Sequence, residues 1–175
     1  MSILAGKIQQ IPKWNLKLIM TPNFTSGWEK THEIPATYLP FDHFEIDIIY
    51  DQICLFTHRF SDGAPVIFNA CLDDNQQTTG HELCIHLRGA DIDNNFVVQG
   101  KTITLGIELD MYIEDIDLTW YLNNYDCFFT QSGQCKKGTK FMSENGRLLV
   151  NIQTPIYPWL FENEQHIVEQ YIQNL

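Results

Sequence analysis

The sequence is poor in basic residues. Lysine and arginine number 11 against 22 aspartates and glutamates, which gives a formal net charge of −11 at pH 7. This acidic protein therefore repels phosphate backbones and anionic headgroups, which argues against nucleic-acid and membrane-surface partners. Long apolar runs are missing as well: Ile3 to Ala5 is soon interrupted by Lys7, and no stretch reaches membrane-spanning length. We expect no membrane insertion and a cytoplasmic location, with export without a leader as the alternative.

Recognisable catalytic and cofactor motifs are also absent. The chain has no glycine-rich phosphate loop, no G-x-S-x-G elbow and no nucleophile beside a recognisable base. The stretch TGHELCIHLRG (Thr79 to Gly89) resembles the zinc-protease motif H-E-x-x-H, but His81 and His86 are five positions apart rather than four. That spacing does not place both imidazoles on one helix face. We therefore expect a protein that is not an enzyme and that needs no cofactor or metal.

Disulfides are not expected, although the chain contains five cysteines. Without a leader, these cysteines are typical of free thiols in a reducing compartment. Cys54, Cys71 and Cys84 lie in strand-like sequence, where cysteine most often packs as a small apolar side chain.

Alternating apolar residues dominate the chain, as in Phe44-Ile46-Ile48 and Leu148-Val150-Ile152. A period of two indicates half-buried strands, and the breaks between the runs supply glycine, asparagine and proline for tight turns. The pattern predicts one all-β domain over residues 1–175, built as a two-sheet antiparallel β-sandwich. Expected strands cover Asn15–Met20, Phe44–Tyr50, Ile53–Phe60, Val66–Leu72, Glu82–Arg88, Lys101–Asp110, Asp117–Asn123, Cys127–Gln131 and Arg147–Gln153.

The C-terminus changes to helical spacing, with Ile167, Val168, Tyr171, Ile172 and Leu175 on one face. We expect an amphipathic helix over about residues 162–175 that docks on the sandwich, and a partner-binding helix is the alternative. Acidic residues at the start of this segment favour a helix N-terminus.

One strand face also presents a possible metal site. In an extended Glu82–Arg88, the side chains of Glu82, Cys84 and His86 point to one side, and all three types can bind zinc. Such a site needs a further ligand from elsewhere, for which His58 and Cys54 are candidates. Under this alternative the chain is a metal-dependent enzyme. If the three side chains are simply packed, they form no metal site.

The segment from Phe44 to Phe129 resembles the galectins, the cytosolic β-galactoside-binding lectins. LFTHRF (Leu55 to Phe60) is similar to their H-x-N-P-R-F strand, VIFNA (Val66 to Ala70) to their V-x-N element, and TGHELC (Thr79 to Cys84) to their W-G-x-E-x-R element. The resemblance implies a galectin- or concanavalin-like jelly roll that binds a glycan in a groove on its concave face.

Matched position by position, Arg59, Asn69 and Glu82 retain the family's sugar-binding residues. The implied ligand-binding set is these three with Thr57, on a face shared with Leu55 and Arg59, and with His81 as a substitute stacking surface. The family's stacking tryptophan and second arginine are replaced by Thr79 and Cys84, which implies altered specificity. The resemblance predicts a non-catalytic glycan-binding protein. The alternative function is a protein-interaction module on the same sandwich. The chain could also form a homodimer.

Overall fold

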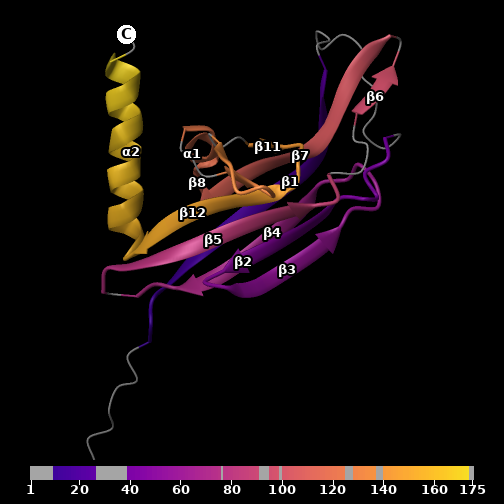
Figure 1. Cartoon of the computed structure of the whole chain (residues 1–175). Coiled ribbons are helices and arrows are strands. Elements are labelled where there is room, and N and C mark those ends of the chain that lie inside the picture. Colours follow the sequence, from indigo (N-terminus) through magenta and orange to yellow (C-terminus); the bar gives the residue numbers. More distant parts are fainter. Residues whose placement is uncertain are drawn as a thin grey trace, which may run out of the picture.

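A computed structural model describes residues 10–26, 39–75, 77–90, 95–98, 100–124, 128–136 and 140–173. Two antiparallel sheets pack face to face, and a helix follows them at the C-terminus (Figure 1). The predicted all-β sandwich with a C-terminal helix is therefore confirmed. Within the described residues, no helix combines the length and apolar character that crossing a membrane requires.

Sheet A contains β1 (Lys13–Ser26), β4 (Val66–Asp73), β6 (Asn95–Val98), β7 (Lys101–Ile113), β8 (Ile116–Asp117) and β11 (Phe141–Met142). Its order is β11-β7-β1-β4, and β6 and β8 also pair with β7. Strand β1 pairs with β7 on one side and with β4 on the other, so it is an inner strand of this sheet and not an addition at its edge.

Sheet B contains β2 (Glu45–Tyr50), β3 (Ile53–Arg59), β5 (Thr79–Arg88), β9 (Phe128–Thr130), β10 (Cys135–Lys136) and β12 (Gly146–Thr154). Its order is β10-β9-β12-β5-β2-β3. Residues that alternate along β2, β5 and β12 are fully buried against sheet A, among them Ile46, Ile85 and Val150. Because strand side chains alternate between faces, Asp47, His86 and Arg147 point away from the core. We call the face that carries them the outer face of sheet B.

Both sheets end in a strand with one unpaired edge. Within the described residues, β3 pairs only with β2 and β4 only with β1. Each edge strand exposes a large apolar side chain, Ile53 at 66% and Ile67 at 56%. The short connection between β3 and β4 carries the chain from sheet B to sheet A, so strands adjacent in sequence lie in different layers.

One predicted strand, Asp117–Asn123, is wrong, because most of it forms the short helix α1 (Thr119–Asn124). The Asp117 carboxylate accepts a hydrogen bond from the Thr119 backbone N–H at 2.8 Å, as a helix N-cap does. Leu118, Tyr121 and Leu122 are buried together, at the three- and four-residue spacing of a helix. Local capping therefore outweighs the strand-like alternation of the sequence.

The C-terminal helix α2 (Ile156–Gln173) begins six residues before the predicted position. Its N-terminus is capped by Asp74, whose Oδ1 accepts a hydrogen bond from the Ile156 backbone N–H at 3.0 Å. The predicted acidic residues at its start, Glu162 and Glu164, lie outside its first turn.

Among the α2 side chains that the structure describes, those at the beginning of the helix dock on the sandwich. Ile156, Trp159 and Leu160 are buried in the core, whereas Phe161 and Ile172 are exposed. Figure 1 shows the helix projecting away from the strands beyond this point. The prediction that residues 162–175 dock on the sandwich is wrong for Ile172, the one residue of its predicted apolar face whose side chain the structure describes.

Candidate ligand site on the outer face of sheet B

The structure does not bring the predicted ligand-binding residues into one groove. Asn69 lies exposed on β4 of sheet A, whereas Arg59 and Glu82 belong to sheet B. Arg59 is level with Glu45 and Arg88 in the register of sheet B. Glu82 is six residues from Arg88 along β5, which corresponds to about 20 Å at the rise of a strand. A galectin-type groove shared by Arg59, Asn69 and Glu82 is therefore not formed.

Thr57 and Arg59 point to the outer face of sheet B but have partners within the chain. Thr57 Oγ1 donates a hydrogen bond to Asp47 Oδ1 at 2.7 Å, and Arg59 Nε donates one to the Asp42 carbonyl at 2.9 Å. Leu55, which is expected on the same face, lies at a bulge in β3 and has no paired residue in β2, so its place on this face stays a prediction. The neighbouring Cys54 has its Sγ 3.5 Å from Thr57 Oγ1.

His81 is held at the other end of the sheet. Its Nδ1 lies 2.7 Å from Asp51 Oδ2 and its Nε2 lies 3.2 Å from Thr154 Oγ1. Its ring stacks on Tyr50, with 5.4 Å between ring centroids. Burial raises the pKa of Asp51, but hydrogen bonds from His81 and the Glu82 backbone outweigh it, so this pKa is below its usual range.

The Asp51-His81-Thr154 arrangement has the connectivity of a catalytic triad. A nucleophilic hydroxyl must reach the substrate, however, and Thr154 is only 1% exposed. Its hydroxyl also lies 3.4 Å from the Thr79 carbonyl, which it can reach as a donor. The three side chains therefore serve to join the turn after β2 to the ends of β5 and β12.

Glu82, Cys84 and His86 alternate along β5 as expected, but they do not form a metal site. Within the described ranges, no group of three or more His, Cys, Asp or Glu side chains could hold a metal ion. Cys84 is 6% exposed, and burial raises the pKa of its thiol to about 11. Zinc requires the thiolate, so this environment opposes the metal-dependent alternative.

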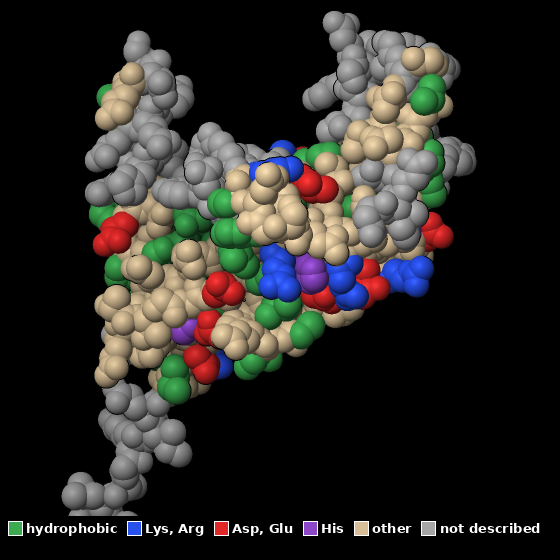
Figure 2. Space-filling model, viewed as in Figure 1, with side chains coloured by type: hydrophobic (Ala, Val, Ile, Leu, Met, Phe, Trp, Pro, Cys, Tyr) green, Lys and Arg blue, Asp and Glu red, His purple; other side chains and the backbone are tan. Residues whose placement is uncertain are grey.

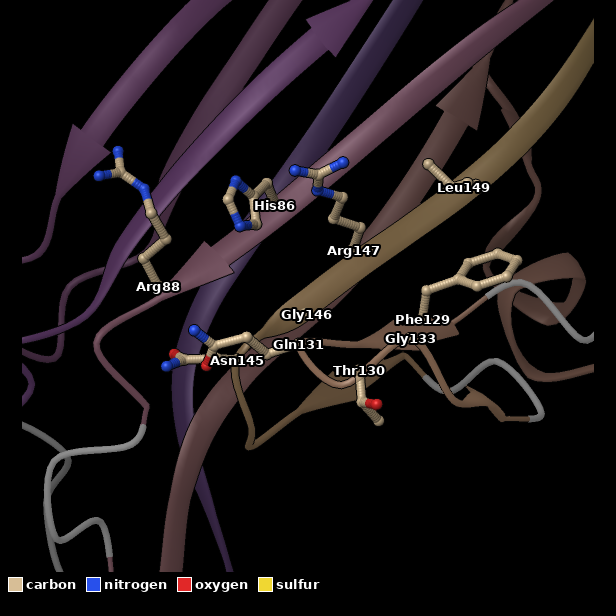
Figure 3. Close-up of a pocket in the computed structure, with 10 residues that line it drawn as sticks. All are labelled: His86, Arg88, Phe129, Thr130, Gln131, Gly133, Asn145, Gly146, Arg147 and Leu149. Atoms are coloured by element: carbon tan, nitrogen blue, oxygen red, sulfur yellow. The ribbon is translucent and has the colours of Figure 1, made fainter.

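An open pocket of about 620 Å³ lies on the outer face of sheet B, where β5, β12 and β9 meet. Among the residues that the structure describes, its lining contains two arginines, a histidine, an aromatic ring and amide side chains, and neither an aspartate nor a glutamate. The residues are His86, Arg88, Phe129, Thr130, Gln131, Gly133, Asn145, Gly146, Arg147 and Leu149 (Figure 3).

The pairing of three strands sets the centre of this pocket. In the register, Arg147 lies opposite His86 on one side and opposite Phe129 on the other. Figure 3 shows Arg147 beside His86, with Arg88 beyond the imidazole and Phe129 on the far side of Arg147. The pocket thus places an apolar ring next to a row of nitrogen donors.

Gly146 and Asn145 build the floor and rim of the pocket. A Cβ on Gly146 would lie 2.5 Å from Phe128 Cζ and 2.6 Å from the Phe129 carbonyl oxygen, so only glycine allows β9 to approach β12 this closely. Asn145 Oδ1 accepts a hydrogen bond from the Ala90 backbone N–H at 2.8 Å, which fixes the amide.

The charges around the pocket are unevenly paired. Arg88 bonds Asp47 through Nε at 3.1 Å and also contacts Glu45. The Arg147 side chain, in contrast, makes no hydrogen bond or ion pair within the described part of the chain. Burial lowers the pKa of His86, and the nearby charge of Arg147 lowers it further against the opposite effect of Asp47. His86 is therefore predominantly neutral at pH 7, which leaves Arg147 as the unpaired charge.

The sequence pattern does not predict this pocket. It points to His86 only as a metal ligand and gives no role to Phe129, Asn145 or Arg147. The one available signal was the predicted strand that starts at Arg147, in which alternation with the apolar Leu148 and Val150 places Arg147 on the outer face.

Comparisons with known proteins place the chain in no family. No protein-family profile matches it, and no curated protein does. One solved structure, described as vCBM60 in complex with galactobiose, is similar over 79% of this chain and 99% of that chain. The TM-score is 0.41 and the sequence identity 8%. At these values the similarity carries no argument about the ligand of this chain.

Proposed function

We propose that the chain is a non-catalytic glycan-binding protein whose ligand occupies the pocket between β5, β9 and β12. The observation that carries the proposal is the placement of Phe129 beside Arg147 and the amide side chains of Gln131 and Asn145. A sugar ring needs an apolar surface for its C–H face and directional donors for its hydroxyl groups. The pocket offers both within one open surface.

The composition of the pocket favours binding over hydrolysis. Most glycoside hydrolases use a pair of carboxylates, one as acid and one as base or nucleophile. The described residues of the pocket lining include no carboxylate. We also propose a cytoplasmic location, because a reducing compartment would keep Cys54, Cys71, Cys84 and Cys135 as free thiols.

A glycan array probed with the full chain tests this proposal. Phe129→Ala removes the apolar surface and should reduce the array signal at least tenfold. Phe161→Ala is the matched control, because Phe161 lies exposed on α2, and this variant should bind as the wild type does. Circular dichroism checks that both variants are folded.

Two results would contradict glycan binding in this pocket. One is an array signal that survives Phe129→Ala in a folded protein. The other is an array without any signal for the wild type, which would favour the protein-interaction alternative on the same sandwich.

A further inference from the structure

The pocket has the opposite charge character to the chain around it. Acidic residues outnumber basic ones two to one in the whole sequence, 22 to 11, yet the described residues that line the pocket include Arg88, Arg147 and His86 and no acid. Figure 2 shows Lys, Arg and His side chains gathered near the middle of this view, with acidic side chains close by. Described lining residues that are all basic or neutral, in so acidic a protein, suit an anionic ligand.

Most basic side chains that the structure describes already have a partner. Lys13 pairs with Asp73, Lys136 with Glu144 and Lys140 with Glu108. Lys17 lies over the ring of Tyr112, 5.2 Å from its centroid, and Arg59 bonds a carbonyl. Arg147 is the one arginine for which the described residues supply neither a carboxylate nor a carbonyl partner.

Asp47 is level with Arg147 on the outer face of sheet B, but it is too far away to form an ion pair with it. The two residues are two strands apart, which corresponds to about 10 Å. The two oxygens of Asp47 are already engaged by Thr57 and Arg88. The side chain between them is His86, which is an imidazole and supplies no negative charge. No described residue therefore occupies the five N–H donors of the Arg147 guanidinium, which can bind a ligand.

The neighbours of Arg147 narrow the chemistry of that ligand. A planar carboxylate accepts two parallel hydrogen bonds from a guanidinium, an arrangement that is stronger than bonds to neutral hydroxyls. Phe129, next to Arg147 in the register, would lie against the ring that carries the carboxylate. A neutral sugar in the same position would desolvate the arginine without offering a counter-charge.

We infer that the ligand of this pocket is an acidic saccharide containing a hexuronic acid, whose carboxylate is bound by Arg147. This inference rests on the proposed glycan-binding function and adds the class of sugar. No covalent bond is made or broken, so the chain binds the carboxylate without changing it.

Disaccharides that differ only at C6 of one hexose test the inference directly. The C6 group is a hydroxymethyl, a carboxylate or a sulfate ester, in gluco, galacto and manno series. Titration calorimetry with the full chain should show the carboxylate form binding at least tenfold more tightly than the hydroxymethyl form in at least one series. In Arg147→Gln this preference should disappear, while Arg59→Gln, the matched control on the same face, should keep it.

A second readout follows the imidazole of His86 by NMR. The positive charge of Arg147 lowers the pKa of His86 in the free protein. A carboxylate bound at Arg147 would offset this charge and so raise the pKa of His86. The hydroxymethyl disaccharide should leave this pKa unchanged. The same titration in Arg147→Gln should show no effect of the acidic sugar.

The outcomes separate this inference from the proposed function. If all C6 forms bind equally and Phe129→Ala abolishes binding, the pocket binds glycans, but the inference that its ligand contains a hexuronic acid is wrong. If the sulfate ester binds more tightly than the carboxylate, the assignment to hexuronic acid is also overturned. If no saccharide of any series binds, the proposed function itself fails and the inference with it.

Discussion

Asp47 organises the outer face of sheet B at the scale of single residues. It is 9% exposed and bonds Thr57 on one neighbouring strand and Arg88 on the other. Its burial acts to raise the pKa of the carboxyl, but these hydrogen bonds outweigh that effect and the pKa is lower than usual. The folded state therefore favours the ionised form of Asp47.

This preference makes the contribution of Asp47 dependent on pH. A carboxyl whose pKa is lowered on folding stabilises the protein fully above its unfolded pKa of about 4, and this contribution is lost as the pH falls through the folded pKa. We expect Asp47→Asn to lower the free energy of unfolding by about 1–3 kcal/mol at pH 7. Urea unfolding of both proteins between pH 7 and pH 3 should show the difference shrinking below about pH 4.

Asp42→Asn serves as the control for this titration, because the Asp42 side chain is 73% exposed. It should change the free energy of unfolding little at any pH in this range. A difference between wild type and Asp47→Asn that stays constant down to pH 3 would contradict the assigned direction of the pKa shift.

At the scale of elements, the junction between β4 and α2 depends on a buried carboxylate. Asp74 follows β4, is 5% exposed and accepts a hydrogen bond from the first residue of the helix. A carboxylate at this position also interacts favourably with the helix dipole. The helix is thus fixed to sheet A through its N-terminus, while its body extends from β12.

Asp74→Ala should therefore destabilise the protein by about 1–2 kcal/mol, the loss expected for a helix cap. The neighbouring Asp73→Ala is a matched control, since Asp73 makes only an exposed ion pair with Lys13 and should matter little. Urea unfolding, followed by the fluorescence of the tryptophans, measures both. Equal effects of the two substitutions would show that the cap does not hold α2.

Elements with strong alternation could be predicted from the sequence, and those fixed by local polar contacts could not. Ile103 to Leu109 and Leu148 to Ile152 alternate so regularly that β7 and β12 follow directly from the pattern. The segment that forms α1 has strand-like alternation, but the hydrogen bond from the Thr119 backbone N–H to Asp117 Oδ1 favours the helix. The two-residue strands β10 and β11 are too short for any periodicity to show.

The candidate site was harder to predict than the strands that form it. Arg147, His86 and Phe129 come together only through the pairing of β12 with β5 and β9, which residue spacing does not determine. The motifs that resemble the galectins predict a shared groove for Arg59 and Asn69, but the chain changes sheets between Arg59 and Val66. Residues close in sequence are here separated by the thickness of the sandwich.

The whole molecule consists of a sandwich and a helix that is only partly integrated into it. Ile156, Trp159 and Leu160 belong to the core, whereas Phe161 and Ile172 are exposed. Removing a large buried apolar side chain costs about 2–5 kcal/mol. Loss of all three would therefore remove an amount comparable to the 5–15 kcal/mol that stabilises a typical domain.

We expect a chain that ends after Asn163 to unfold cooperatively, with a midpoint close to that of the full chain. A chain that ends after Thr154 should show no cooperative transition, because it lacks the three core residues of α2. Thermal unfolding followed by circular dichroism distinguishes the two. A large loss of stability in the longer truncation would show that the remainder of α2 also supports the sandwich.

The unpaired edges of β3 and β4 have a consequence for handling the protein. An open edge with exposed apolar side chains is a template for pairing with another chain. At neutral pH the net charge of −11 keeps molecules apart, but this repulsion vanishes near the isoelectric point of about 4.8. Purification and storage should therefore avoid mildly acidic buffers, in which colloidal stability is lowest and Ile53 and Ile67 would favour precipitation.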